Sequence, residues 1–110
     1  LVLSGDIHSA WVNVLKADYA DPASPTVATE FVCTSVTARN PVGGQLALVL
    51  GGNPHIKFLD IQHGYTICHV TLARWQADYR VVQSVETPDA SVQTIASFVV
   101  EDGTPGAVKV

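Results

Sequence analysis

The chain has 110 residues, of which 47% are hydrophobic and 15% charged, and its formal net charge is −4 at pH 7. This composition predicts one folded domain, and the six lysines and arginines are too scattered to form a nucleic-acid-binding surface. The longest apolar run, 46–50, is far shorter than the roughly 18 residues that a membrane span needs.

The predicted elements begin with an apolar run, Leu1–Leu3, which we expect to form a buried strand. Residues 11–19 alternate only weakly, and both a strand and an irregular helix fit them. A loop with two prolines at 21–25 separates this segment from a β-branched strand at 27–37. A second loop follows at 40–44.

A short helix is predicted at 45–50, ended by Gly51 and Gly52. Residues 56–61 are expected to form a strand. The segments 65–71 and 77–85 are expected to pair as an antiparallel hairpin, because a short connection joins them. The remaining predicted elements are a compact turn at 72–76, a turn at 87–90, a long strand at 92–100 and a frayed end from 103 onward. The predicted fold class is α+β, mainly antiparallel β.

The first candidate site follows the opening run. Gly5 permits a tight turn, and Asp6 and His8 come next with one residue between them. In an extended backbone, residues two apart project to the same side, so a carboxylate and an imidazole would converge just past the strand. Such a pair suits iron, manganese, zinc or calcium. The alternative is that Asp6 caps the turn and His8 is an ordinary core or surface histidine.

The other histidines are weaker candidates. His55 follows a proline, which is one way to aim a side chain into a site, although an exposed loop histidine is the alternative. His63 is expected to face solvent, and His69 is expected to pack within its strand. The hydroxyls of Thr34, Ser35 and Thr37 could donate to a phosphate or a metal-bound water, and the alternative is that they bond the local backbone.

Two cysteines, Cys33 and Cys68, lie in separate predicted strands and form no CxxC pair. Buried free thiols are one interpretation, and a disulfide between neighbouring strands is the other. The sequence contains no methionine and opens inside an apolar run. We therefore expect a piece of a longer protein, with an excised mature domain as the alternative.

Seven segments, taken in order, resemble the closing part of the PhoD-like alkaline phosphatases. The segment containing Asp6 and His8 resembles the last metal-binding motif of that family. The segments are Val2–Trp11, Glu30–Thr37, Asn53–Phe58, His63–Tyr65, Val70–Thr71, Arg74–Val82 and Ala96–Glu101. The resemblance covers nearly the whole chain.

The resemblance implies that residues 1–110 are the C-terminal portion of a metallophosphatase catalytic domain. Its fold would be part of a metallophosphoesterase-type β-sandwich flanked by helices, as in the purple acid phosphatases. Asp6 and His8 would be metal ligands for iron and calcium, with the other ligands upstream. The substrates would be phosphate mono- or diesters, and His55 would contact phosphate or a metal-bound water. Neither Cys33 nor Cys68 matches the family's metal-binding cysteine.

The resemblance also implies that the full-length parent is secreted, in the periplasm or outside the cell. We expect the isolated chain to be inactive. Three departures stand out. Ala38 replaces a serine common in the family, the connection 39–52 is unusual, and the turn 71–74 lacks a common proline. The alternative function is a catalytically silent β-rich binding or structural module.

Overall fold

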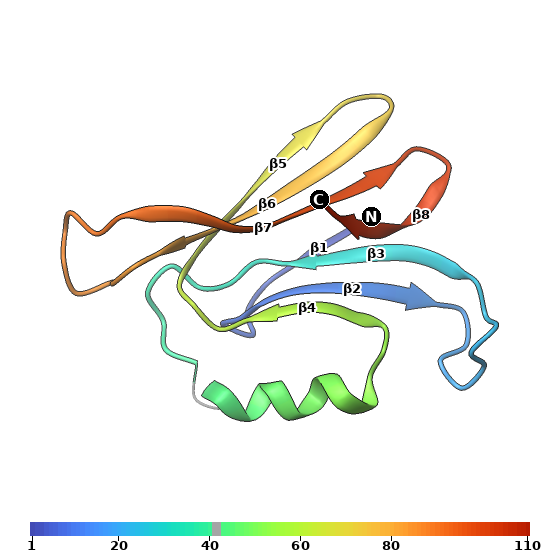
Figure 1. Cartoon of the computed structure of the whole chain (residues 1–110), viewed down its shortest axis with the longest axis horizontal. Coiled ribbons are helices and arrows are strands. Elements are labelled where there is room, and N and C mark those ends of the chain that lie inside the picture. Colours follow the sequence, from blue (N-terminus) through green and yellow to red (C-terminus); the bar gives the residue numbers. More distant parts are fainter. Residues whose placement is uncertain (41–42) are drawn as a thin grey trace.

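Two four-stranded sheets make up the fold (Figure 1). A computed structural model describes residues 1–40 and 43–110. The strand orders are β1-β3-β2-β4 and β5-β6-β7-β8, and every pair is antiparallel except β1 with β3. The elements are β1 (Val2–Ser4), β2 (Ala10–Lys16), β3 (Thr26–Val32), the 3-10 helix η1 (Gly43–Gly52), β4 (Ile56–Asp60), β5 (Gly64–Val70), β6 (Arg74–Val82), β7 (Val92–Glu101) and β8 (Thr104–Lys109).

The mainly antiparallel β prediction is confirmed, and most predicted strands are present with shifted ends. Residues 10–16 form a strand, not an irregular helix. β3 ends at Val32, well before the predicted Thr37. The next residues cross to the other sheet, where the Thr34 hydroxyl donates to the Gln62 carbonyl (3.0 Å) and the Gly64 N–H to the Ser35 carbonyl (3.1 Å).

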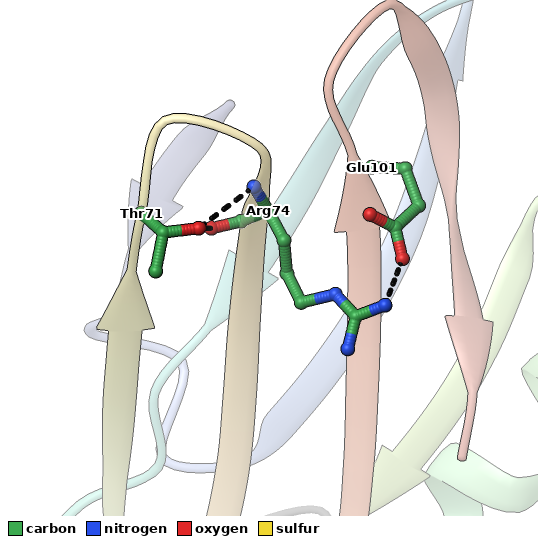
Figure 2. A network of polar contacts seen from close by, with 3 residues as sticks. All are labelled: Thr71, Arg74 and Glu101. Atoms are coloured by element: carbon green, nitrogen blue, oxygen red, sulfur yellow. Dashed lines mark hydrogen bonds and ion pairs between the residues drawn. The ribbon is translucent and has the colours of Figure 1, made fainter.

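The turn between β5 and β6 is shorter than predicted, because β6 already begins at Arg74. Figure 2 shows the cause: the Thr71 hydroxyl accepts a hydrogen bond from the Arg74 N–H (3.1 Å). The same arginine forms an exposed ion pair with Glu101 on β7. Exposed pairs of this kind contribute little to stability, so the backbone ladder carries the hairpin.

The predicted frayed end is wrong, because Thr104–Lys109 forms β8 and pairs with β7. An Asp-Gly pair favours a tight hairpin turn, and Gly103 has a φ of 73°. The turn signal at 102–103 therefore joins two strands instead of ending the fold.

Two apolar segments are less buried than predicted. β1 pairs only with β3 at the edge of its sheet, and Leu1, Val2 and Leu3 are 54%, 40% and 60% exposed. The predicted short helix is a longer 3-10 helix, η1, which continues through both final glycines and has no buried residue in the part of the chain described. It lies beside β4, away from the second sheet (Figure 1). Pro41 and Val42 of the predicted loop 40–44 lie outside the described residues.

The core lies between the two sheets. Phe58 on β4 contacts the rings of Tyr79 and Phe98 on the other sheet, with centroids 5.1 and 5.5 Å apart. The Tyr79 hydroxyl donates to the Trp11 carbonyl at 2.6 Å, and burial raises the pKa of this phenol. Tyr79 therefore joins the sheets through both packing and a hydrogen bond. The fully buried cluster is Ala10, Val12, Phe31, Ala77, Tyr79, Ala96 and Phe98.

Both cysteines are free thiols, but the predicted burial is wrong for one of them. Cys33 is half-buried, and Cys68 is exposed. β5, which carries Cys68, is an edge strand of its sheet, so no further strand covers it. Among the described residues, no helix is long and apolar enough to cross a membrane.

A glycine-to-alanine change tests how closely β5 and β6 approach. A Cβ at Gly64 would lie 1.9 Å from the Arg80 carbonyl oxygen, so the backbone must move. We expect Gly64→Ala to lower the free energy of unfolding by about 3 kcal/mol or more, measured by denaturant unfolding. In the matched control, Gly51→Ala, a Cβ meets nothing within 4 Å, and a change within about 0.5 kcal/mol is expected. Equal effects of the two variants would contradict this packing.

Candidate functional site

The candidate site centres on the turn between β1 and β2. Asp6 and His8 both have positive φ angles, 72° and 59°. The extended backbone predicted here is therefore wrong, because both residues adopt the left-handed conformation. Aspartate and histidine tolerate it better than most residues, yet it still costs about 1 kcal/mol or more for each. Such local strain is typical of functional sites, and it persists only where surrounding contacts hold the turn.

His8 is held by a segment far away in the sequence. Its Nδ1 lies 2.9 Å from the Arg39 carbonyl oxygen. Because a carbonyl can only accept, Nδ1 must carry the hydrogen, and in the neutral ring the lone pair is then on Nε2. The Asn40 side-chain amide donates to the His8 carbonyl at 3.1 Å. Residues 39–40 thus fix both the ring and the backbone of His8.

Hydrogen bonds fix both ends of the turn to neighbouring residues of the first sheet. The Ser4 carbonyl accepts a hydrogen bond from the Cys33 N–H at 2.9 Å, which holds the end of β1 beside β3. Ser9 is fully buried, and its hydroxyl accepts from the Trp11 indole N–H at 2.6 Å. Asp6 is exposed, and His8 is half-buried. The turn therefore carries the Asp6 carboxylate and the oriented His8 imidazole between two ends that hydrogen bonds hold in place.

The hydroxyls of Thr34 and Ser35, after β3, donate hydrogen bonds to backbone carbonyls of this chain. The Ser35 hydroxyl donates to the Ala38 carbonyl at 2.5 Å and lies 3.3 Å from Nδ1 of His63. Since the hydroxyl has one hydrogen, the ring N–H of His63 donates to the Ser35 oxygen. His63 is half-buried in this contact, so the predicted solvent-facing role is wrong. Thr34 likewise bonds backbone, in agreement with the backbone alternative for these hydroxyls.

His69 does not pack as predicted. It lies on the edge strand β5 with 61% of its side chain exposed, and its Nε2 is 3.4 Å from Asp78. Hydrogen bonds from Gln76 and Ser97 lower the pKa of the Asp78 carboxyl, and His69 adds to this effect. The pair is a surface contact on the second sheet, apart from the turn.

His55 lies in an open hollow of about 470 Å³ that reaches the turn. Gly5 and Ile7, the residues on either side of Asp6, line the same hollow. The His55 ring packs edge-on against Tyr19, with centroids 4.8 Å apart, and its carbonyl accepts from the Val14 N–H at 2.8 Å. The structure thus brings His55 near the turn. Among the described residues, however, no three potential metal ligands gather in one place.

Glu30 was not singled out from the sequence. Its two carboxylate oxygens accept hydrogen bonds from the Ser4 hydroxyl (2.8 Å) and the Asn13 amide (2.9 Å), and it lines the hollow beside His55. A charged residue within the β-branched run 26–32 was the available signal. Residues 39–40 carried no such signal, because Arg39 acts through its backbone.

The comparisons with known proteins agree with this architecture. Residues 1–79 match the family of PhoD-like phosphatases. The chain is 39% identical over 113 residues to alkaline phosphatase D of Bacillus subtilis (strain 168), covering 100% of this chain and 19% of that protein. A solved structure of PhoD matches with a TM-score of 0.87 and 38% identity, over 99% of this chain and 22% of that one. The chain spans about one fifth of the length of these relatives. It belongs to the PhoD-like phosphatase family.

Proposed function

We propose that residues 1–110 are the C-terminal portion of a metallophosphatase catalytic domain and supply Asp6 and His8 to its metal centre. Family membership supports a phosphatase. The observation that carries the metal role is the hydrogen bond from His8 Nδ1 to the Arg39 carbonyl. Metal-ligating histidines almost always donate their other ring N–H in this way, which orients the ring and leaves the second nitrogen for the metal.

The donor set of the turn fits the metals that the family resemblance implies. A carboxylate suits calcium, and a carboxylate with an imidazole suits iron. Since no three potential ligands gather among the described residues, the remaining ligands would come from polypeptide outside these 110 residues. In the complete domain, the two sheets would belong to a β-sandwich flanked by helices.

The proposed reaction is hydrolysis of a phosphate mono- or diester. When bound, the metal ions would neutralise phosphate oxygens and lower the pKa of a water molecule towards about 7, so that it can attack in line. Asp6 and His8 would hold the metal, and hydrogen bonds with residues 39–40 fix the ring and backbone of His8. His55 would contact the phosphate or the attacking water, and its place in the hollow beside the turn supports this role.

A catalytically silent β-rich binding or structural module is the second candidate. It is favoured by the absence of a three-ligand group in the described part of the chain. The two functions differ in what they require of Asp6, which a silent module does not need.

The ring tautomer of His8 is directly testable. In metal-free protein at about pH 8.5, where an ordinary histidine is neutral, we expect the ring hydrogen on Nδ1, because the Arg39 carbonyl can only accept. Nitrogen-15 NMR of histidine-labelled protein distinguishes the two tautomers. A hydrogen on Nε2 would overturn the proposed orientation of the ring.

Replacing Asp6 tests the metal role. In the full-length gene product, we expect Asp6→Asn to lower kcat/KM for 4-nitrophenyl phosphate by more than about 100-fold, above the 10- to 100-fold loss typical of residues that only support a ligand. Bound metal, measured by elemental analysis, should fall as well.

The matched control is Asp89→Asn, which makes the same change at an exposed aspartate in the loop between β6 and β7. We expect it to leave activity and metal content unchanged. If Asp6→Asn behaved like this control, the silent module would be the better account of the chain.

His55→Phe separates a chemical role from packing. Phenylalanine keeps a ring against Tyr19 but removes both ring nitrogens, so stability should change little. If His55 contacts the phosphate or the attacking water, kcat should fall about 100-fold, measured with the same ester. Full kcat in a stably folded variant would show that His55 only packs.

A further inference from the structure

The hollow beside the turn combines apolar walls with one acidic group. It has a volume of about 470 Å³, within the range of about 300–1,000 Å³ of small-molecule sites. Gly5 and Ile7 form the end next to Asp6, and Tyr19 and His55 line it as well. Apolar side chains from β2 and β3 contribute much of the remaining wall. This is the usual composition of a site for a small organic group, with few polar residues to set specificity.

Glu30 gives this hollow its charge. Hydrogen bonds from Ser4 and Asn13 hold one carboxylate oxygen each, so the side chain is fixed in place. The ion pairs found in the described part of the chain are His69 with Asp78 and Arg74 with Glu101. Neither involves Glu30, and its negative charge therefore acts on whatever enters the hollow.

We propose that this hollow binds the alcohol portion of the phosphate ester, and that Glu30 makes it favour uncharged or cationic alcohols over anionic ones. The inference rests on the proposed function, since it assumes that the phosphate is held at Asp6. Gly5 and Ile7, the residues on either side of Asp6, line the hollow, so we expect the organic substituent of a phosphate held at Asp6 to enter it. A carboxylate repels a second anion and attracts a cation, and the Tyr19 ring adds attraction for a cation.

Two phosphate esters of similar size test the proposal: 2-aminoethyl phosphate, with a cationic alcohol portion, and carboxymethyl phosphate, with an anionic one. In the full-length gene product, kcat/KM should be higher for the aminoethyl ester. Glu30→Gln should lower the ratio of the two kcat/KM values about tenfold, as expected for losing one charge in a partly hydrated site. The shape is kept, and the Asn13 amide can turn so that its Oδ1, buried without a partner, accepts from the new amide.

The control is Glu86→Gln, the same substitution at an exposed glutamate in the loop between β6 and β7. It should leave the ratio unchanged. Binding of the free alcohols, measured by calorimetry, gives a readout besides turnover: ethanolamine should bind more tightly than glycolate, and Glu30→Gln should remove this difference. If Glu30→Gln fails to fold, Tyr19→Lys introduces a positive charge at an exposed residue of the hollow and should lower the same ratio.

The outcomes separate the two proposals. If Asp6→Asn retains activity, the proposed function itself fails. If Asp6→Asn is inactive while a folded Glu30→Gln keeps the wild-type ratio, only the alcohol site is overturned. Equal changes in Glu30→Gln and Glu86→Gln would assign the effect to overall charge and would also overturn it.

Discussion

The hydrogen bond from Tyr79 to the Trp11 carbonyl is the interaction on which the rest of the structure depends. Tyr79 is buried among rings from both sheets, so the bond fixes β2 against β6 in the buried core. Trp11 in turn fixes the end of the turn between β1 and β2, because its indole N–H donates to the buried Ser9 hydroxyl. Only one residue separates Trp11 from Ser9, and His8 is the residue immediately before Ser9. The position of the turn is thus a consequence of the core.

The core alone does not explain the conformation of the turn. Asp6 and His8 both lie in the left-handed region, which costs conformational free energy. The pairing of β2 within its sheet does not offset this cost. Two hydrogen bonds between His8 and residues 39–40 offset this cost: the His8 ring donates to the Arg39 carbonyl, and the Asn40 amide donates to the His8 carbonyl. A hydrogen bond typically contributes about 1 kcal/mol, so the two are of the right size to balance the strain. A turn held in this way would already have the geometry needed to bind the proposed metal ion.

The sequence predicts the interior of the fold better than its edges. The strands predicted at 77–85 and 92–100 lie inside the second sheet as β6 and β7, and one face of each is buried in the core. The exposure of β1 and of His69 was not predictable, since both depend on which strands end up at an edge. The left-handed turn was not predicted, because an Asp-x-His sequence is compatible with both an extended and a left-handed backbone. The role of residues 39–40 depends on contacts across 31 and 32 positions, which no local pattern records.

The turn therefore has two separable faces. His8 is oriented towards the 39–40 segment by its ring hydrogen bond, while Gly5 and Ile7 line the hollow with Glu30. Glu30 accepts a hydrogen bond from Ser4, at the end of β1. A change at Glu30 alters the charge of the hollow without touching either hydrogen bond that holds His8. The proposed metal ligand His8 and the proposed specificity residue Glu30 are thus held by different hydrogen bonds: His8 by residues 39–40, and Glu30 by Ser4 and Asn13. In the proposed enzyme, a change at Glu30 would therefore alter substrate preference and leave the proposed metal ligands in place.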